Sequence, residues 1–224
     1  MSIKTPIKAV IFDLDGTLID SLPDLAASAN RVRQLYNLEP LPLEKIRSYI
    51  GDGMRTLIHR TLTDSREGKN EELIEAALAE HAAYYSAHLL DKTLPFPNTP
   101  DVLAQLSARN IKLSVVTNKP EKNARRILDF FNLAQFFTGI YGGDTLPRRK
   151  PFPDLLLAAC EKMQVLPEQT LMLGDSENDF LAGRAANCQV VFAAYGYGKL
   201  EYLPADPDAQ ISDIGEILPL TVGA

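Results

Sequence analysis

Two carboxylates that directly follow an apolar segment are the residues best suited to chemistry in this chain of 224 residues. Residues 9–12 are apolar and predict a buried strand, and Asp13 and Asp15 come where that strand ends. Gly16 then lets the chain turn away at once. In an open α/β sheet, ligands bind at the carboxyl ends of strands. Because two acids one residue apart repel each other unless a cation or a shared proton separates them, the pair predicts a functional site.

Polar side chains also follow three later apolar segments. Thr117 and Asn118 come after one of them, Lys150 comes after a second, and Asp175 comes after a third. Because the carboxyl ends of parallel strands meet at one edge of a sheet, we expect these side chains to converge with the first acidic pair. Carboxylate oxygens at that density suit Mg²⁺, a hard cation that favours oxygen ligands.

The predicted group of side chains suits phosphoryl transfer to a carboxylate. Asp13 can attack phosphorus and form an aspartyl-phosphate. A phosphate dianion repels that carboxylate, and Mg²⁺ on Asp13 and Asp175, with Lys150 opposite, would cancel the repulsion. Thr117 and nearby backbone amides can hold the phosphoryl oxygens. Asp15 can protonate the leaving alkoxide and later deprotonate water.

Each of these residues also has a structural interpretation. Asp15 can be a turn residue before glycine, and Thr117 and Asn118 can be loop residues that end a strand. Lys150 follows two arginines and can be a surface lysine. Asp179 follows a serine by three residues, which is the spacing of a helix capping box. It therefore either caps a helix or supports a metal ligand.

The elements that must position these residues alternate between strands and helices after residue 98. This alternation predicts an α/β fold with a doubly wound parallel sheet that helices cover on both faces. Between the first strand and residue 92, by contrast, apolar residues recur only at helical spacing. Strands are expected at residues 9–12, 111–117, 138–141, 170–173 and 189–193. Helices are expected to begin at residues 21, 54 and 99 and after a cap at Asn70. Further helices are expected near residues 43–49 and at 121–131, 153–163 and 177–186.

The helical stretch predicts a second domain inserted into the first. Residues 1–18 and 93–224 would form the catalytic α/β core, and residues 19–92 a helical cap domain, a natural mobile lid. Within it, Gly51 and Gly53 would let backbone amides approach a small anion, and Arg55 would pair with a carboxylate. The alternative is that the glycines only separate two helices and that Arg55 lies in solvent.

Bulk composition favours a cytoplasmic protein, and the predicted site makes a small phosphorylated metabolite its expected partner. The net charge of −6 argues against nucleic acid and anionic membranes as partners, because both require neutralised phosphates. No apolar stretch approaches the roughly 20 residues that span a bilayer. Cys160 and Cys188 lack metal-ligand spacing and are expected to be buried, reduced thiols. The composition leaves a monomer and a homodimer equally open.

Four motifs, taken in order, resemble the haloacid dehalogenase superfamily of aspartate-nucleophile phosphatases. Residues 13–17 resemble its first motif, Thr117 its second, Lys150 its third and residues 174–179 its fourth. A helical cap between the first motif and the second strand also matches. The resemblance covers essentially the whole chain and implies a Rossmann-like core with an inserted α-helical cap.

The resemblance also implies a role for each site residue. Asp13 would be the nucleophile and a metal ligand, and Asp15 the acid and base that also binds Mg²⁺ through its main-chain carbonyl. Asp175 would be the third protein ligand of Mg²⁺, with Asp179 in support. The residues expected to contact the substrate are Asp13, Leu14, Asp15, Thr117, Asn118, Lys150, Gly51, Gly53 and Arg55.

Longer segments are similar to phosphoglycolate phosphatases, which implies hydrolysis of 2-phosphoglycolate to glycolate and phosphate. These segments are residues 50–53, 116–120, 142–144, 174–179 and 195–198. Three alternatives stay open. The first is a related enzyme, namely a sugar phosphomutase, a pyrophosphatase or a nucleotide phosphatase. The second is a phospho-acceptor signalling domain, and the third is a non-catalytic relative. A signalling domain fits less well, because its acidic pair precedes the acceptor aspartate and it is about half this length.

Overall fold

The computed structural model of the chain describes residues 5–64 and 71–222. The chain divides into two compact units: an α/β unit made of Met1–Ile19 and Pro95–Ala224, and a helical unit made of Asp20–Leu94. It passes from one unit to the other at two short strands, β2 (Ile19–Asp20) and β3 (Leu94–Pro95), which pair with each other. The expected cap at Asn70 lies outside the described residues.

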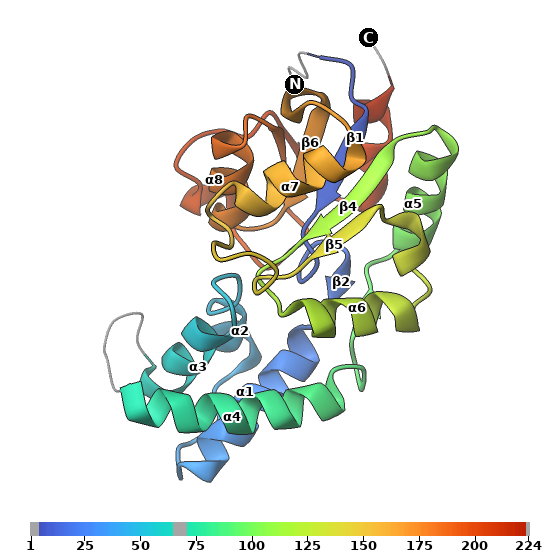
Figure 1. Cartoon of the computed structure of the whole chain (residues 1–224). Helices are drawn as coiled ribbons and strands as arrows, with labels where there is room; N and C mark the ends of the chain where they lie inside the picture. Colours follow the sequence, from blue (N-terminus) through green and yellow to red (C-terminus); the bar gives the residue numbers. More distant parts are fainter. Residues whose placement is uncertain (1–4, 65–70, 223–224) are drawn as a thin grey trace. The chain divides into compact units, whose positions relative to one another are not determined.

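The α/β unit is built on a six-stranded sheet in the order β5-β4-β1-β6-β7-β8, in which neighbouring strands are parallel (Figure 1). This confirms the predicted doubly wound parallel sheet. Its strands are β1 (Ala9–Phe12), β4 (Lys112–Val116), β5 (Gly139–Tyr141), β6 (Thr170–Gly174), β7 (Gln189–Ala193) and β8 (Ala209–Ile211). The sequence did not predict β8, because three residues between acidic and polar neighbours carry no strand pattern.

Helices cover the sheet, and this explains why the strands are apolar on both faces. Every residue of β1 is buried, and Ala9 and Ile11 share an apolar cluster with Leu156 of α7 and Ala182 of α8. Helix α7 packs on β1, β4 and β5 (Figure 1). The helices of this unit are α5 (Thr99–Ala108), α6 (Glu121–Phe130), α7 (Asp154–Met163) and α8 (Glu177–Ala185), with short 3-10 helices at Ala134–Phe136, Pro167–Gln169, Leu200–Tyr202, Ile214–Ile217 and Pro219–Thr221. As predicted, Cys160 and Cys188 are buried free thiols.

Within its described residues, 20–64 and 71–94, the helical unit has four helices whose apolar faces meet. Val32, Ile58 and Ala77, which come from three different helices, are buried together. The helices are α1 (Leu22–Leu35), α2 (Leu43–Arg47), α3 (Met54–Thr63) and α4 (Glu71–His88). Across the ranges 5–64 and 71–222, none of the helices is both long enough and apolar enough to cross a bilayer.

The start of α1 differs from its expected chemistry. Ser21 is the N-cap residue, as predicted, but its side chain makes no capping hydrogen bond. The buried carboxylate of Asp24 instead accepts hydrogen bonds from the backbone amides of Lys92 and Thr93 and from the Thr93 hydroxyl, at 2.8–3.0 Å. Asp24 therefore fixes the segment by which the chain leaves the helical unit, a contact between residues too distant in sequence for a local capping rule to reveal.

Candidate active site

Three buried carboxylates come together at the carboxyl end of the sheet. Asp13 follows β1, Asp175 follows β6, and Asp179 lies in the first turn of α8. Each offers an oxygen within 4.8 Å of the other two. Asp179 also forms the predicted capping box with Ser176, and its role in support of a metal ligand stays a prediction.

Lys150 is the cation placed inside this acidic cluster. Its Nζ lies 2.9 Å from Asp13 Oδ1 and 2.5 Å from Asp179 Oδ1, and it donates to the carbonyl oxygen of Val116 at 2.8 Å. The side chain is only 2% exposed, which excludes the surface-lysine interpretation. Asp13 Oδ1 also accepts from the backbone amide of Leu14 at 2.7 Å. Two donors on one oxygen fix how the Asp13 carboxylate is turned.

One lysine does not balance the charge of three carboxylates. Burial, reinforced by the neighbouring Asp179 and only partly opposed by Lys150, raises the pKa of Asp13 to about 8. Burial and Asp179 likewise raise the pKa of Asp175 to about 7. Burial acts to lower the pKa of Lys150, but the anions of Asp13 and Asp179 outweigh it and hold that pKa above its ordinary value. The cluster therefore lacks positive charge, which a divalent cation with oxygen ligands would supply.

The loop of residues 195–198 holds Asp175 through its backbone. The amides of Tyr197 and Gly198 donate to Asp175 Oδ2 at 2.7 and 3.2 Å. A side chain at Gly198 would place its Cβ 1.8 Å from the Asp175 carbonyl oxygen. Gly16 has a φ of +82°, and a Cβ there would lie 2.4 Å from Asp175 Oδ2. Glycine is therefore needed on both sides of this carboxylate, at Gly16 for its conformation as well.

Replacing Gly198 with alanine is expected to lower the free energy of unfolding by about 2 kcal/mol, because the new methyl group overpacks the backbone of Asp175. If a divalent cation binds the acidic cluster, the change should also weaken activation by that cation, since the two amides that orient Asp175 must move. Urea unfolding and a Mg²⁺ titration of activity measure both effects. Gly215→Ala is the matched control, because its Cβ would meet only the side chain of Asp213. Equal effects of the two substitutions would contradict this account.

Thr117 and Asn118 lie beside the cluster at the end of β4. Both residues are buried. Thr117 Oγ1 accepts a hydrogen bond from the backbone amide of Lys119 at 3.2 Å, and Asn118 Nδ2 donates to the carbonyl oxygen of Lys150 at 3.0 Å. Asn118 thus ties the segment that carries Lys150 to the end of β4. Direct contact of either side chain with a substrate stays a prediction.

Asp15 has a partner that sequence reasoning did not identify. Both oxygens of its carboxylate accept from Lys119 Nζ, at 2.7 and 2.8 Å. The sequence signals were the position of Lys119 directly after a predicted strand and its place in residues 116–120, one of the segments on which the resemblance rests. The bond joins residues 104 positions apart, so local patterns gave no indication of it.

The predicted substrate residues of the second domain lie in the helical unit, between α2 and α3 and at the start of α3. Gly51 and Gly53 have φ angles of +117° and +84°, and Gly53 is the N-cap of α3. Arg55 forms an ion pair with Glu75 of α4. Their backbone conformations explain why glycine occupies both positions, and the contact of these three residues with a substrate stays a prediction.

Comparison with known proteins agrees with the fold. A family model described as haloacid dehalogenase-like hydrolase matches residues 10–193. A phosphoglycolate phosphatase of Neisseria meningitidis is 42% identical over 216 residues, covering 94% of this chain and 92% of the relative, and one of Chromobacterium violaceum is 41% identical over 96% of each chain. The crystal structure of a predicted phosphoglycolate phosphatase from Haemophilus somnus matches with a TM-score of 0.88 at 34% identity, covering 98% of this chain and 100% of that chain. The chain therefore belongs to the haloacid dehalogenase-like hydrolase family and is an enzyme.

Proposed function

We propose that this enzyme is a Mg²⁺-dependent phosphatase that hydrolyses 2-phosphoglycolate to glycolate and phosphate through an aspartyl-phosphate. The observation that carries the proposal is the buried cluster of Asp13, Asp175 and Asp179 around Lys150. A site with several anions and one cation suits a divalent metal and the phosphoryl group that it would bind. The two relatives described above are named phosphoglycolate phosphatases and support the choice of substrate.

The metal would be held by oxygen ligands at the carboxyl end of the sheet. We assign it the carboxylates of Asp13 and Asp175 and the main-chain carbonyl of Asp15, with Asp179 beside them. When bound, Mg²⁺ would neutralise charge on the phosphoryl oxygens and on the attacking carboxylate. The raised pKa values of Asp13 and Asp175 support this assignment, because they report carboxylates short of compensating positive charge.

The first chemical step transfers the phosphoryl group to the protein. A carboxylate oxygen of Asp13 forms a bond to phosphorus while the ester P–O bond breaks, and its electron pair stays on the leaving oxygen. That oxygen takes a proton from the carboxyl group of Asp15 and leaves as the hydroxyl of glycolate. Lys150 orients Asp13 through the bond to Oδ1, and Thr117 hydrogen-bonds to a phosphoryl oxygen.

The second step returns the protein to its starting state. Asp15, now a carboxylate, takes a proton from a water molecule as that water attacks phosphorus. The bond between phosphorus and the Asp13 oxygen breaks, which releases hydrogen phosphate, restores the Asp13 carboxylate and leaves the proton from water on the Asp15 carboxyl group. The net reaction consumes one water and requires no other reactant, so the chain needs no redox cofactor for it.

Discrimination among phosphate esters requires contacts beyond the phosphoryl group. We propose that the helical unit is a cap domain and that Gly51, Gly53 and Arg55 bind the carboxylate of the substrate. The positive φ angles of the two glycines support this, because glycine without a side chain leaves the loop backbone open to the close approach of a small anion. The cation of Arg55 matches a carboxylate, which would compete with Glu75 for it.

Phosphate release from a panel of small phosphorylated compounds tests the proposal. The panel contains 2-phosphoglycolate, sugar phosphates, nucleotides and pyrophosphate, each with Mg²⁺ and with EDTA. We expect the highest kcat/KM for 2-phosphoglycolate, and loss of activity in EDTA that added Mg²⁺ restores. If kcat/KM for another compound exceeded the value for 2-phosphoglycolate about tenfold, that compound and not 2-phosphoglycolate would be the preferred substrate. Full activity in EDTA would remove the metal from the mechanism.

A further inference from the structure

The ion pair between Lys119 and Asp15 is unusually well shielded for two charged side chains. The Lys119 side chain is 3% exposed and that of Asp15 is 14% exposed. Fixing a long lysine side chain and removing both charges from water is unfavourable, so such a pair contributes little to stability by itself. The burial of the Lys119–Asp15 ion pair therefore favours a functional role for it over a purely stabilising one.

The backbone on either side of the Lys119 side chain is also fixed. The Lys119 amide donates to Thr117 Oγ1 at 3.2 Å, and its carbonyl oxygen accepts from the amide of Gly143 at 2.9 Å. A Cβ on Gly143 would lie 2.6 Å from the carbonyl oxygen of Asn118, so glycine permits this close approach of two loops. Gly143 thus anchors the loop from which Lys119 reaches Asp15.

We propose that Lys119 is a positioning residue that holds the Asp15 carboxyl group in place for proton transfer to the leaving oxygen. The inference rests on the proposed function, in which Asp15 is the acid and base. Nζ bridges both oxygens of the Asp15 carboxylate and so restricts its rotation. When Asp15 carries the proton for the first step, Nζ can still donate to the other oxygen, and the protonated oxygen must lie within about 2.6–3.2 Å of the leaving oxygen. Lys119 acts through Asp15 and takes no part in bond making itself.

This role makes a distinctive prediction, because protonation matters only for a poor leaving group. Departure of an alkoxide needs a proton, whereas p-nitrophenolate leaves without one. We expect Lys119→Met to lower kcat/KM about 100-fold for an alkyl phosphate and less than about fivefold for p-nitrophenyl phosphate. The ratio kcat/KM is the right measure, because it includes only the steps up to departure of the leaving group.

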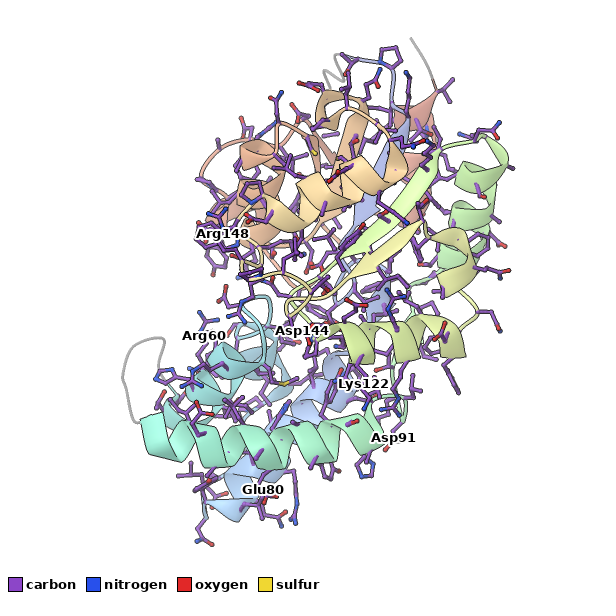
Figure 2. The ribbon with its side chains drawn as sticks, viewed as in Figure 1. Arg60, Glu80, Asp91, Lys122, Asp144 and Arg148 are labelled. Carbon is purple, nitrogen blue, oxygen red and sulfur yellow. The ribbon has the colours of Figure 1, made fainter. Side chains whose placement is uncertain are left out.

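Three further variants make the result decisive. Lys122→Met, on the exposed surface of α6 (Figure 2), should leave kcat/KM unchanged for both the alkyl phosphate and p-nitrophenyl phosphate. Lys119→Gln, which keeps a hydrogen-bond donor, should lie between Lys119→Met and the unchanged protein, and thermal unfolding checks that both variants are folded. In an Asp15→Asn background, Lys119→Met should have no further effect, because its target is already absent.

Each outcome separates this inference from the proposed function. Equal losses for both leaving groups, or an additional loss in the Asp15→Asn background, would show that Lys119 binds the substrate directly and would overturn the inference. If Asp15→Asn itself fails to discriminate between the leaving groups, Asp15 is not the acid and the proposed mechanism fails. If Asp15→Asn discriminates and Lys119→Met does not, only the role of Lys119 is refuted.

Discussion

Asp13→Asn is expected to lower kcat about 10⁴-fold or more, since an amide cannot supply the oxygen that attacks phosphorus. The fold should tolerate the change. Asparagine keeps a carbonyl oxygen in the place of Oδ1, which accepts from the amide of Leu14 and from Lys150 Nζ. The substitution also removes one negative charge from a cluster that has too many, so the free energy of unfolding in EDTA should stay the same or rise. Activity and stability would thus move in opposite directions.

Rapid-quench kinetics and mass spectrometry measure this expectation. Beryllium fluoride, which mimics a phosphoryl group on a carboxylate, should bind the unchanged protein with Mg²⁺ present and should not bind the variant. Asp129→Asn, on the exposed face of α6, is the control and should retain full turnover. Turnover near the unchanged level in Asp13→Asn, or a phosphoryl group found on a different side chain, would rule out Asp13 as the nucleophile.

The sequence predicted the site where local chemistry determines structure. Apolar segments buried on both faces identify parallel strands, and in such a sheet their polar ends must share an edge. Asp13, Lys150 and Asp175 could therefore be expected to converge, and the structure brings all three together. The capping box of Asp179 was predictable for the same reason, since its partner is three residues away.

What the sequence did not reveal depends on contacts between distant segments. Lys119 reaches Asp15 across 104 positions, and Asp24 accepts from residues 68 and 69 positions away. Gly198 touches the backbone of Asp175 because two loops approach closely, which no periodicity records. Lys119 and Gly198 lie in segments on which the family resemblance rests, but no local pattern in the sequence gives either of them, or Asp24, its contact, because these contacts exist only in three dimensions.

Lys150→Met should abolish most of the activity and also destabilise the fold, unlike Asp13→Asn. Methionine fills similar space without the charge, so it leaves three buried carboxylates without their lysine. We expect kcat/KM to fall about 10³-fold, the effect of losing a preorganised electrostatic partner. The free energy of unfolding should fall by about 3 kcal/mol, as when one partner of a buried ion pair is removed. Lys162→Met, exposed on α7, is the control and should change neither quantity.

The pH dependence of that destabilisation distinguishes lost charge from lost packing. The folded-state pKa of Asp13 is raised to about 8. Between about pH 4 and 8, the unfolded chain therefore releases a proton that the folded chain keeps. Because the folded state binds more protons over this range, the free energy of unfolding falls as pH rises. Lys150 opposes this loss of stability because its charge lowers the pKa of Asp13. The pKa of Lys150 itself is raised, so the lysine stays charged and keeps its contribution to the free energy of unfolding through neutral pH. Urea unfolding in EDTA should therefore show a larger deficit for Lys150→Met at about pH 8 than at about pH 5. A deficit that is independent of pH would mean that the lysine acts through its packing, and the charge balance proposed for the cluster would be wrong.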